Sequence, residues 1–105
     1  MLRAIETNQA YLDQITYQMN IMSHEEQNVK LSGSIALAKT NSTLIMEQCA
    51  REGVQLFGGL GYSRGGQGHR VERLYRDTHA FSLGGGSEEV LLDLSIRQAM
   101  KMSKL

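Results

Sequence analysis

The feature that most constrains the fold is a set of mostly apolar residues that recur at alternating steps of four and three between residues 29 and 57. This spacing places side chains on one face of a helix, so a helix of roughly 28 residues is predicted here. A second, weaker stripe predicts packing on more than one side, as in a central bundle helix or at an oligomer interface. The main stripe consists of Leu31, Ile35, Ala38, Ser42, Ile45, Cys49, Glu52 and Leu56, and the second of Leu37, Leu44 and Val54.

Three more helices are predicted, over residues 2–22, 70–81 and 87–102. Apolar spacing indicates the first, and pairs of opposite charge four residues apart indicate the second. Ser87 is the predicted N-cap of the last helix, because Glu88 and Glu89 follow it in the first turn. Residues 23–28 are polar and are predicted to be a connection. No useful stretch alternates with a period of two and proline is absent, so the predicted fold class is all-α.

Length and composition limit the kinds of protein to which the chain can belong. Its 105 residues and 41% hydrophobic content predict one globular domain, residues 1–105, whose modest core leaves room for partners. The net charge of +0 gives no overall field for nucleic acid, and no apolar run approaches the ~20 residues that span a bilayer. Cys49 lies on the apolar stripe, and with three scattered histidines it gives no metal-ligand spacing.

Two glycine-rich stretches are candidate ligand-contacting segments. In the first, Gly58, Gly59 and Gly61 would let a backbone or a flat ligand approach, although a helix C-cap needs only one of them. A dinucleotide-binding fingerprint is excluded, because its third glycine is missing and the stretch follows a helix instead of a strand. In the second, residues 84–87 form either a ligand-contacting turn or a plain helix cap, and both interpretations stay open.

The one basic concentration consists of Arg64, His69, Arg70, Arg73 and Arg76. Arginine forks match phosphate groups, so an anion site is one interpretation. The other is a solvated helix face, with Glu72 and Asp77 pairing with the arginines four residues away. Nucleic-acid binding is weakly supported, since aromatic residues are sparse and the chain has no overall positive field.

Three motifs, taken together and in this order, resemble the C-terminal domain of acyl-CoA dehydrogenases. The resemblance covers essentially all 105 residues and implies an antiparallel four-helix up-and-down bundle built from the four predicted helices. The motifs are Gln55-Leu56-Phe57-Gly58-Gly59-Leu60-Gly61-Tyr62, then Val71-Glu72-Arg73-Leu74-Tyr75-Arg76-Asp77, then Gly86-Ser87-Glu88-Glu89-Val90.

The resemblance also implies a cofactor and a set of contacting residues. FAD would contact two segments, the first of which reaches the flavin of a neighbouring subunit in a homodimer or homotetramer. Gly86 and Arg97 match positions on the substrate side, where an acyl-CoA would bind. The segments that match the FAD-contacting residues are Gln55, Leu56, Phe57, Gly58 and Gly59, and then Ser87, Glu88 and Glu89.

One departure from the family pattern affects the chemistry. Many members place their catalytic glutamate at the position of Gly85, which cannot accept a proton, so no catalytic residue is predicted in this chain. Some branches carry the glutamate on an earlier helix, which would precede Met1. In the full enzyme the base would remove the α-proton of an acyl thioester while a hydride passes from the β-carbon to FAD. The isolated chain is therefore expected to be inactive.

Other functions remain as alternatives to this one. They are a helical assembly module with a vestigial cofactor surface, an acyl-CoA oxidase-type domain, and an anion- or nucleic-acid-binding bundle that uses the basic concentration. The last three residues, Ser103-Lys104-Leu105, match the tripeptide that the peroxisomal import receptor binds. The tripeptide predicts a peroxisomal protein whose C-terminus is natural. Any part of the protein that is missing is expected to lie upstream of Met1.

Overall fold

The computed structural model describes residues 1–103, and every regular element in this range is helical. The all-α prediction is therefore confirmed for this part of the chain. Lys104 and Leu105, on which the targeting prediction rests, lie outside the described residues. In chain order the elements are α1 (Leu2–Ile21), α2 (His24–Lys30), α3 (Ser32–Phe57), α4 (Gly59–Tyr62), the 3-10 turn η1 (Gly66–Gly68), α5 (His69–Leu83) and α6 (Glu88–Ser103).

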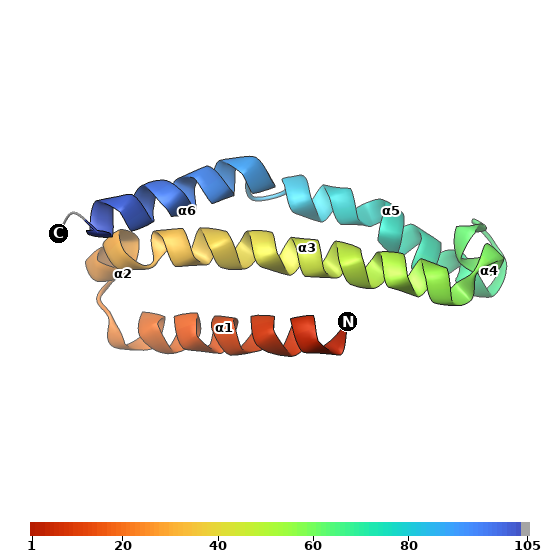
Figure 1. Ribbon diagram of the computed structural model, residues 1–105, viewed down its shortest axis with the longest axis horizontal. Coiled ribbons are helices and arrows are strands. Elements are labelled where there is room, and N and C mark those ends of the chain that lie inside the picture. The colour runs from red at the N-terminus through yellow and green to blue at the C-terminus, as the bar shows by residue number, and fades with distance from the viewer. Residues whose placement is uncertain (104–105) are drawn as a thin grey trace.

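The long helix α3 lies in the middle of the molecule (Figure 1). The helix α1 runs antiparallel to α3 along one side, and α5 and α6 follow one another end to end along the other side. The short helix α4 turns the chain back at the far end of α3. This arrangement does not by itself confirm the four-helix antiparallel bundle, because α3 separates α1 from the α5–α6 pair.

The molecule is more open than a closed domain of its size. Its extents are 55 × 24 × 20 Å and its radius of gyration is 17.0 Å, whereas a compact domain of this length has a radius of about 13 Å. Its accessible surface is 7702 Å², against roughly 5,900 Å² for a compact monomer of this mass. The helices therefore leave surface uncovered that a closed bundle would bury.

Small residues line the contacts of α3 and let its neighbours approach closely. Ala36, Ala38 and Ala50 are all buried. A Cβ atom added at Gly33 would lie 3.0 Å from Gln98 of α6, and one at Gly53 would lie 3.3 Å from Val71 of α5. Close approach increases the dispersion contacts between helices that bury few large side chains.

The predicted connection over residues 23–28 is wrong, because the helix α2 occupies most of it. Ser23 and Glu26 form a reciprocal capping box, in which the Glu26 N–H donates to the Ser23 hydroxyl at 3.3 Å and the Ser23 N–H donates to the Glu26 carboxylate at 3.1 Å. These bonds satisfy free N–H groups of a first helical turn, so a helix forms without apolar spacing. Leu31 separates α2 from α3, which therefore begins at Ser32 and not at residue 29.

Candidate functional site

The end of α3 presents the first predicted cofactor-binding segment to the outside of the chain. Residues 55–60 are all exposed, with Leu56 at 77%. Close by, Tyr62 is 86% exposed. Large apolar side chains at such exposure favour contact with a ligand or a partner, since burying them would be favourable.

The glycines of this segment serve different purposes. Gly58 follows α3 with a φ of +55°, a conformation that L side chains rarely adopt, so it ends the helix. A Cβ at Gly61 would lie 2.8 Å from the carbonyl oxygen of Val54, and one at Gly68 would overlap the Leu60 carbonyl. A Cβ at Gly59 would have no atom within 4 Å. The helix-cap interpretation therefore accounts for Gly58 and internal packing for Gly61, which leaves Gly59 open to an outside group.

The second predicted segment is the turn between α5 and α6. Gly85 and Gly86 have φ angles of +76° and +117°. α6 begins at Glu88, and the Ser87 carbonyl accepts the N–H of Leu91 at 3.0 Å, so Ser87 occupies the predicted N-cap position. Glu88 and Glu89 lie in the first turn, as predicted.

Sequence reasoning missed Lys39, which ties this turn to α3. Its ammonium group donates to the carbonyl oxygens of Ser82 at 2.7 Å and of Gly86 at 2.9 Å. The signal that could have revealed it is a lysine among the buried small residues of a central helix. A charge at such a place requires polar partners from a neighbouring element.

Within one chain the two predicted FAD-contacting segments, residues 55–59 and 87–89, lie far apart. Lys39 touches Gly86, and from Lys39 to Phe57 α3 rises about 27 Å, given its 1.5 Å per residue. Arg97 is likewise distant from Gly86, about 15 Å farther along α6. Arg97 pairs with Asp93 on the same helix. Gly86 and Arg97, the two predicted substrate-side positions, therefore lie at different points, the first before α6 and the second within it.

The basic concentration is largely ion-paired. Glu72 accepts from Arg76 at 3.0 Å and lies 4.0 Å from Arg64, and Arg73 lies 3.4 Å from Asp77. The hydrogen bond to Glu72 raises the pKa of Arg76 above its ordinary value. The pairs predicted four residues apart are thus confirmed, and they leave less free positive charge for an anion.

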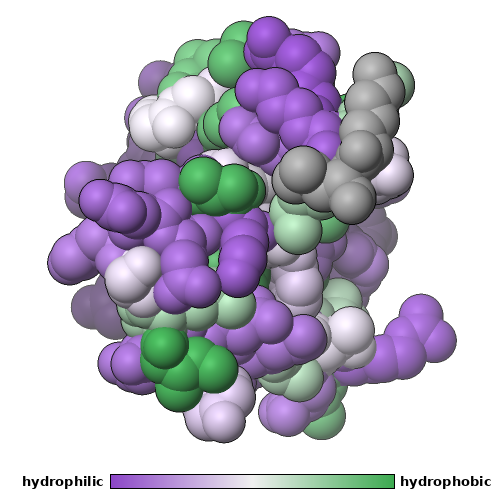
Figure 2. All heavy atoms as spheres, turned by 90° about the vertical axis from the view of Figure 1, so that its left-hand side faces the viewer, coloured by the Kyte–Doolittle hydropathy of each residue, from purple (hydrophilic) through white to green (hydrophobic). Residues whose placement is uncertain are grey.

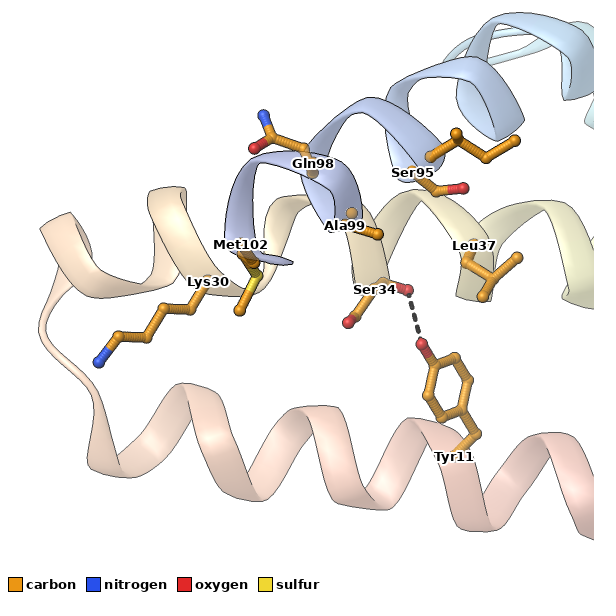
Figure 3. A pocket seen from close by; sticks show the side chains of 10 residues that line it. Tyr11, Lys30, Ser34, Leu37, Ser95, Gln98, Ala99 and Met102 are labelled. Atoms are coloured by element: carbon orange, nitrogen blue, oxygen red, sulfur yellow. Dashed lines mark hydrogen bonds between the residues drawn. The ribbon is translucent and has the colours of Figure 1, made fainter. Parts of the chain in front are cut away.

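Among the cavities beside α3, two are also lined by residues of α6. One, of about 220 Å³, lies between α1, α3 and α6, where the Tyr11 hydroxyl donates to the Ser34 carbonyl at 3.4 Å (Figure 3). The other, of about 450 Å³, lies at the α5–α6 turn and is lined by Lys39, Gly85 and apolar residues such as Leu91. Among the described residues, its lining contains no carboxylate.

Two further absences hold for residues 1–103. No group of three or more His, Cys, Asp and Glu side chains there is arranged to hold a metal ion. None of the helices in this range has the length and apolar character needed to cross a membrane.

Comparison with known proteins identifies the family. Residues 1–100 match the family described as acyl-CoA dehydrogenase, C-terminal domain. The chain is 42% identical over 100 residues to acyl-CoA dehydrogenase apdG of Emericella nidulans, an alignment that covers 95% of this chain and 23% of that protein. It is 35% identical over 99 residues to acyl-CoA dehydrogenase AFT10-1 of Alternaria alternata, covering 92% of this chain and 23% of that protein. No solved structure matches it.

A bacterial relative shows the same similarity over a shorter range. The chain is 33% identical over 76 residues to the probable acyl-CoA dehydrogenase YdiO of Escherichia coli, covering 72% of this chain and 19% of that protein. The chain belongs to the acyl-CoA dehydrogenase C-terminal domain family. The helical structure of residues 1–103 is consistent with that membership. The chain spans about a quarter of the length of its fungal relatives.

Proposed function

We propose that this chain is the FAD-contacting and subunit-contacting domain of an acyl-CoA dehydrogenase-type flavoenzyme. In its complete form the enzyme removes hydrogen from the α- and β-carbons of an acyl-CoA thioester. The observation that carries this proposal is the exposed end of α3, where Gln55 and the open Gly59 coincide with the family's motif. An isolated structural helix end would need only the cap that Gly58 supplies.

FAD fits the residues at both segments. The exposed side chains of Leu56 and Phe57 suit a flat ring system, and the bare backbone at Gly59 permits close approach. At the α6 N-terminus, the carboxylates of Glu88 and Glu89 would repel phosphate, so Ser87 and the adjacent N–H groups suit a neutral, hydrogen-bonding part of the cofactor. When bound, FAD supplies the hydride acceptor.

The separation of the two segments supports an oligomer. A span of about 27 Å along α3 is too long for both segments to contact one isoalloxazine ring. We propose that each chain contacts its own FAD through Ser87, Glu88 and Glu89 and the FAD of a neighbouring subunit through residues 55–59. A homodimer or homotetramer would satisfy this arrangement, and acyl-CoA would bind on the side of Gly86.

The parts that complete the domain and its chemistry would come from elsewhere in the complete protein. Leu37 and Leu44 lie seven residues apart on one face of α3 and remain 41% and 46% exposed. We propose that a further helix covers this face and closes the four-helix bundle. Because Gly85 carries no carboxylate, the base that takes the α-proton would also lie outside these residues, and the chain alone would be inactive.

The surface carries other apolar side chains that are compatible with such a covering element. Seen from the end that holds α2 and the last turn of α6, hydrophobic side chains lie at the surface between polar ones (Figure 2). Across the described residues, the exposed large apolar side chains include Ile21, Val29, Ile96 and Met100. Burial of this surface by a partner would offset the openness of the isolated helices.

We further propose that the complete protein is peroxisomal, because the last residues of this chain match the import tripeptide. The flavin assignment is tested in the complete protein with Gln55→Ala and Gly59→Val, which should lower the bound flavin measured by visible absorbance. Gly65→Ala is the matched control, since a Cβ there also meets no atom within 4 Å but lies outside the proposed contacts. Undiminished flavin in both variants would reject the contact. A complete wild-type protein without flavin would favour the vestigial assembly module.

A further inference from the structure

Lys39 lies about a third of the way along α3 and faces the turn between α5 and α6. Its ammonium group donates to the Ser82 carbonyl at 2.7 Å and to the Gly86 carbonyl at 2.9 Å. The residue is half-buried, unlike Lys101 in the last turn of α6, which is exposed. Two of its three N–H donors are thus used on carbonyls that lie on opposite sides of the turn.

The turn needs such a tie, because it has almost no side chains of its own. Gly84, Gly85 and Gly86 follow one another, and glycine loses more conformational freedom on folding than any other residue. The Ser82 carbonyl belongs to the last turn of α5, whose carbonyls lack partners within the helix and where positive charge is favourable. Lys39 therefore stabilises the end of α5 and the far side of the turn at once.

The bond to the Gly86 carbonyl also fixes the direction of the next amide. The described residues contain no cis peptide, so the Gly86 C=O and the Ser87 N–H lie in one plane and point in opposite directions. The carbonyl points to Lys39 on α3, so the Ser87 N–H points away from α3. Within residues 1–103 this N–H donates to no backbone carbonyl. It is one of the free donors that precede a helix.

We propose that Lys39 is a positioning residue for the cofactor site: by holding the Gly86 carbonyl, it directs the Ser87 N–H outward as a hydrogen-bond donor to the flavin cofactor. The inference rests on the proposed function for the identity of the ligand. The tie itself rests on geometry alone. Lys39 acts through the backbone of Gly86 and Ser87 and makes no contact with the cofactor.

The test compares Lys39→Met with Lys39→Arg in the complete protein. Methionine keeps the unbranched stem but removes every donor, and arginine keeps both the charge and the donors. Lys101→Met is the control for the loss of one positive charge. FAD binding to the apoprotein is measured by flavin fluorescence, and hydrogen exchange is followed at the amides of Gly86 and Ser87.

Lys39→Met should weaken FAD binding by roughly tenfold or more, because hydrogen bonds to a charged group are the strong ones. It should also remove the protection that bound FAD gives the Ser87 amide. Lys39→Arg should retain most of the FAD affinity and most of the protection of the Ser87 amide. Lys101→Met should match the wild type in both quantities. If Lys39→Met does not fold, Lys39→Gln replaces it under the same criteria.

Two outcomes separate a failure of this inference from a failure of the proposed function. Flavin that binds the wild type and Lys39→Met equally well, with equal Ser87 protection, would overturn the positioning role. If the complete wild type binds no flavin, the proposed function fails, and the tie is judged by the Gly86 amide, which donates to the Leu83 carbonyl at 3.3 Å. Equal exchange rates of the Gly86 amide in the wild type and Lys39→Met would then show that the Lys39 hydrogen bonds do not hold the turn. Faster exchange in Lys39→Met would show that they do.

Discussion

Asn8 of α1 and Ser42 of α3 are joined across the helix interface by a hydrogen bond of 2.9 Å from side-chain amide to hydroxyl. Asn41 donates to the Asn8 side-chain oxygen at 2.7 Å, and the Ser42 hydroxyl donates onward to the Ala38 carbonyl at 2.8 Å. Asn8 is only 9% exposed, so this series of bonds is largely shielded from water. The bonds favour one register of α1 on α3, because a shift of either helix would leave polar groups without partners.

Replacement of Asn8 by alanine should therefore destabilise the protein. The change leaves the Asn41 amide without its acceptor and the Ser42 hydroxyl without the amide donor of Asn8, at a cost of about 1–3 kcal/mol. Urea unfolding of the complete protein measures the effect. Gln9→Ala, which removes only an exposed bond to Asp13 on the same helix, should change stability by less than about 0.5 kcal/mol. Equal effects of the two substitutions would mean that the buried bonds contribute nothing specific.

Gly68→Ala should be among the most damaging single changes in the loop before α5. The added Cβ would overlap the Leu60 carbonyl, so α4 would have to move away from the start of α5. Such overpacking typically costs about 1–3 kcal/mol. Thermal unfolding of Gly68→Ala and of Gly65→Ala makes the comparison, since Gly65 has open space and an extended backbone. A Gly68→Ala protein that unfolds at the same temperature as the wild type would show that α4 and α5 are not held so closely.

The capping box of α2 should make a contribution that depends on pH. Hydrogen bonding from the Ser23 backbone, followed by the interaction with Lys30, lowers the pKa of Glu26 below its ordinary value of 4.5. A carboxyl whose folded-state pKa is lowered stabilises the fold above its unfolded pKa, and this contribution is lost as the pH falls through the folded value. Stability measured from neutral pH to below about 4.5 should therefore fall less in Glu26→Gln than in the wild type. A lowered Glu26 pKa in an NMR titration provides the direct check, and an ordinary one would contradict it.

The C-terminal tripeptide predicts import through the peroxisomal receptor. A fluorescent protein that carries the last residues of this chain should enter peroxisomes, because the signal is recognised as a short terminal peptide. The same fusion with Leu105→Asp should stay outside. Co-localisation with a peroxisomal marker is the measurement. Identical distributions of the two fusions would remove the basis for the proposed localisation.

The sequence predicted those parts of the fold that depend on apolar spacing, on charge pairs and on the cap of the last helix. The extents of α1, α5 and α6 follow from such local signals, and so do the pairs that Glu72 and Asp77 make. The helix α2 did not follow, because its formation depends on the Ser23–Glu26 capping box and not on a buried stripe. Nor does spacing reveal that α5 and α6 lie end to end, since it shows which face is apolar but not which helix covers it.

The candidate site was predicted unevenly, for a similar reason. Glycine runs and a capping residue are visible along the chain and drew attention to the two segments, and the family resemblance supplied the individual contact residues. The distinct purposes of Gly59 and Gly61 depend on what a Cβ would meet in space, and the Lys39 tie joins residues more than 40 positions apart. Long-range contacts of this kind leave no periodic trace in a single sequence.

The central position of α3 has a consequence for how such a chain can change in evolution. α1 and the α5–α6 pair meet α3 on different sides, so a substitution on one outer helix need only suit the adjoining side of α3. A substitution on α3 at a position such as Ala38 or Thr40, both buried, has to suit several neighbours at once. The outer helices can therefore diverge independently between related proteins, whereas α3 is expected to change slowly and in concert with its surroundings.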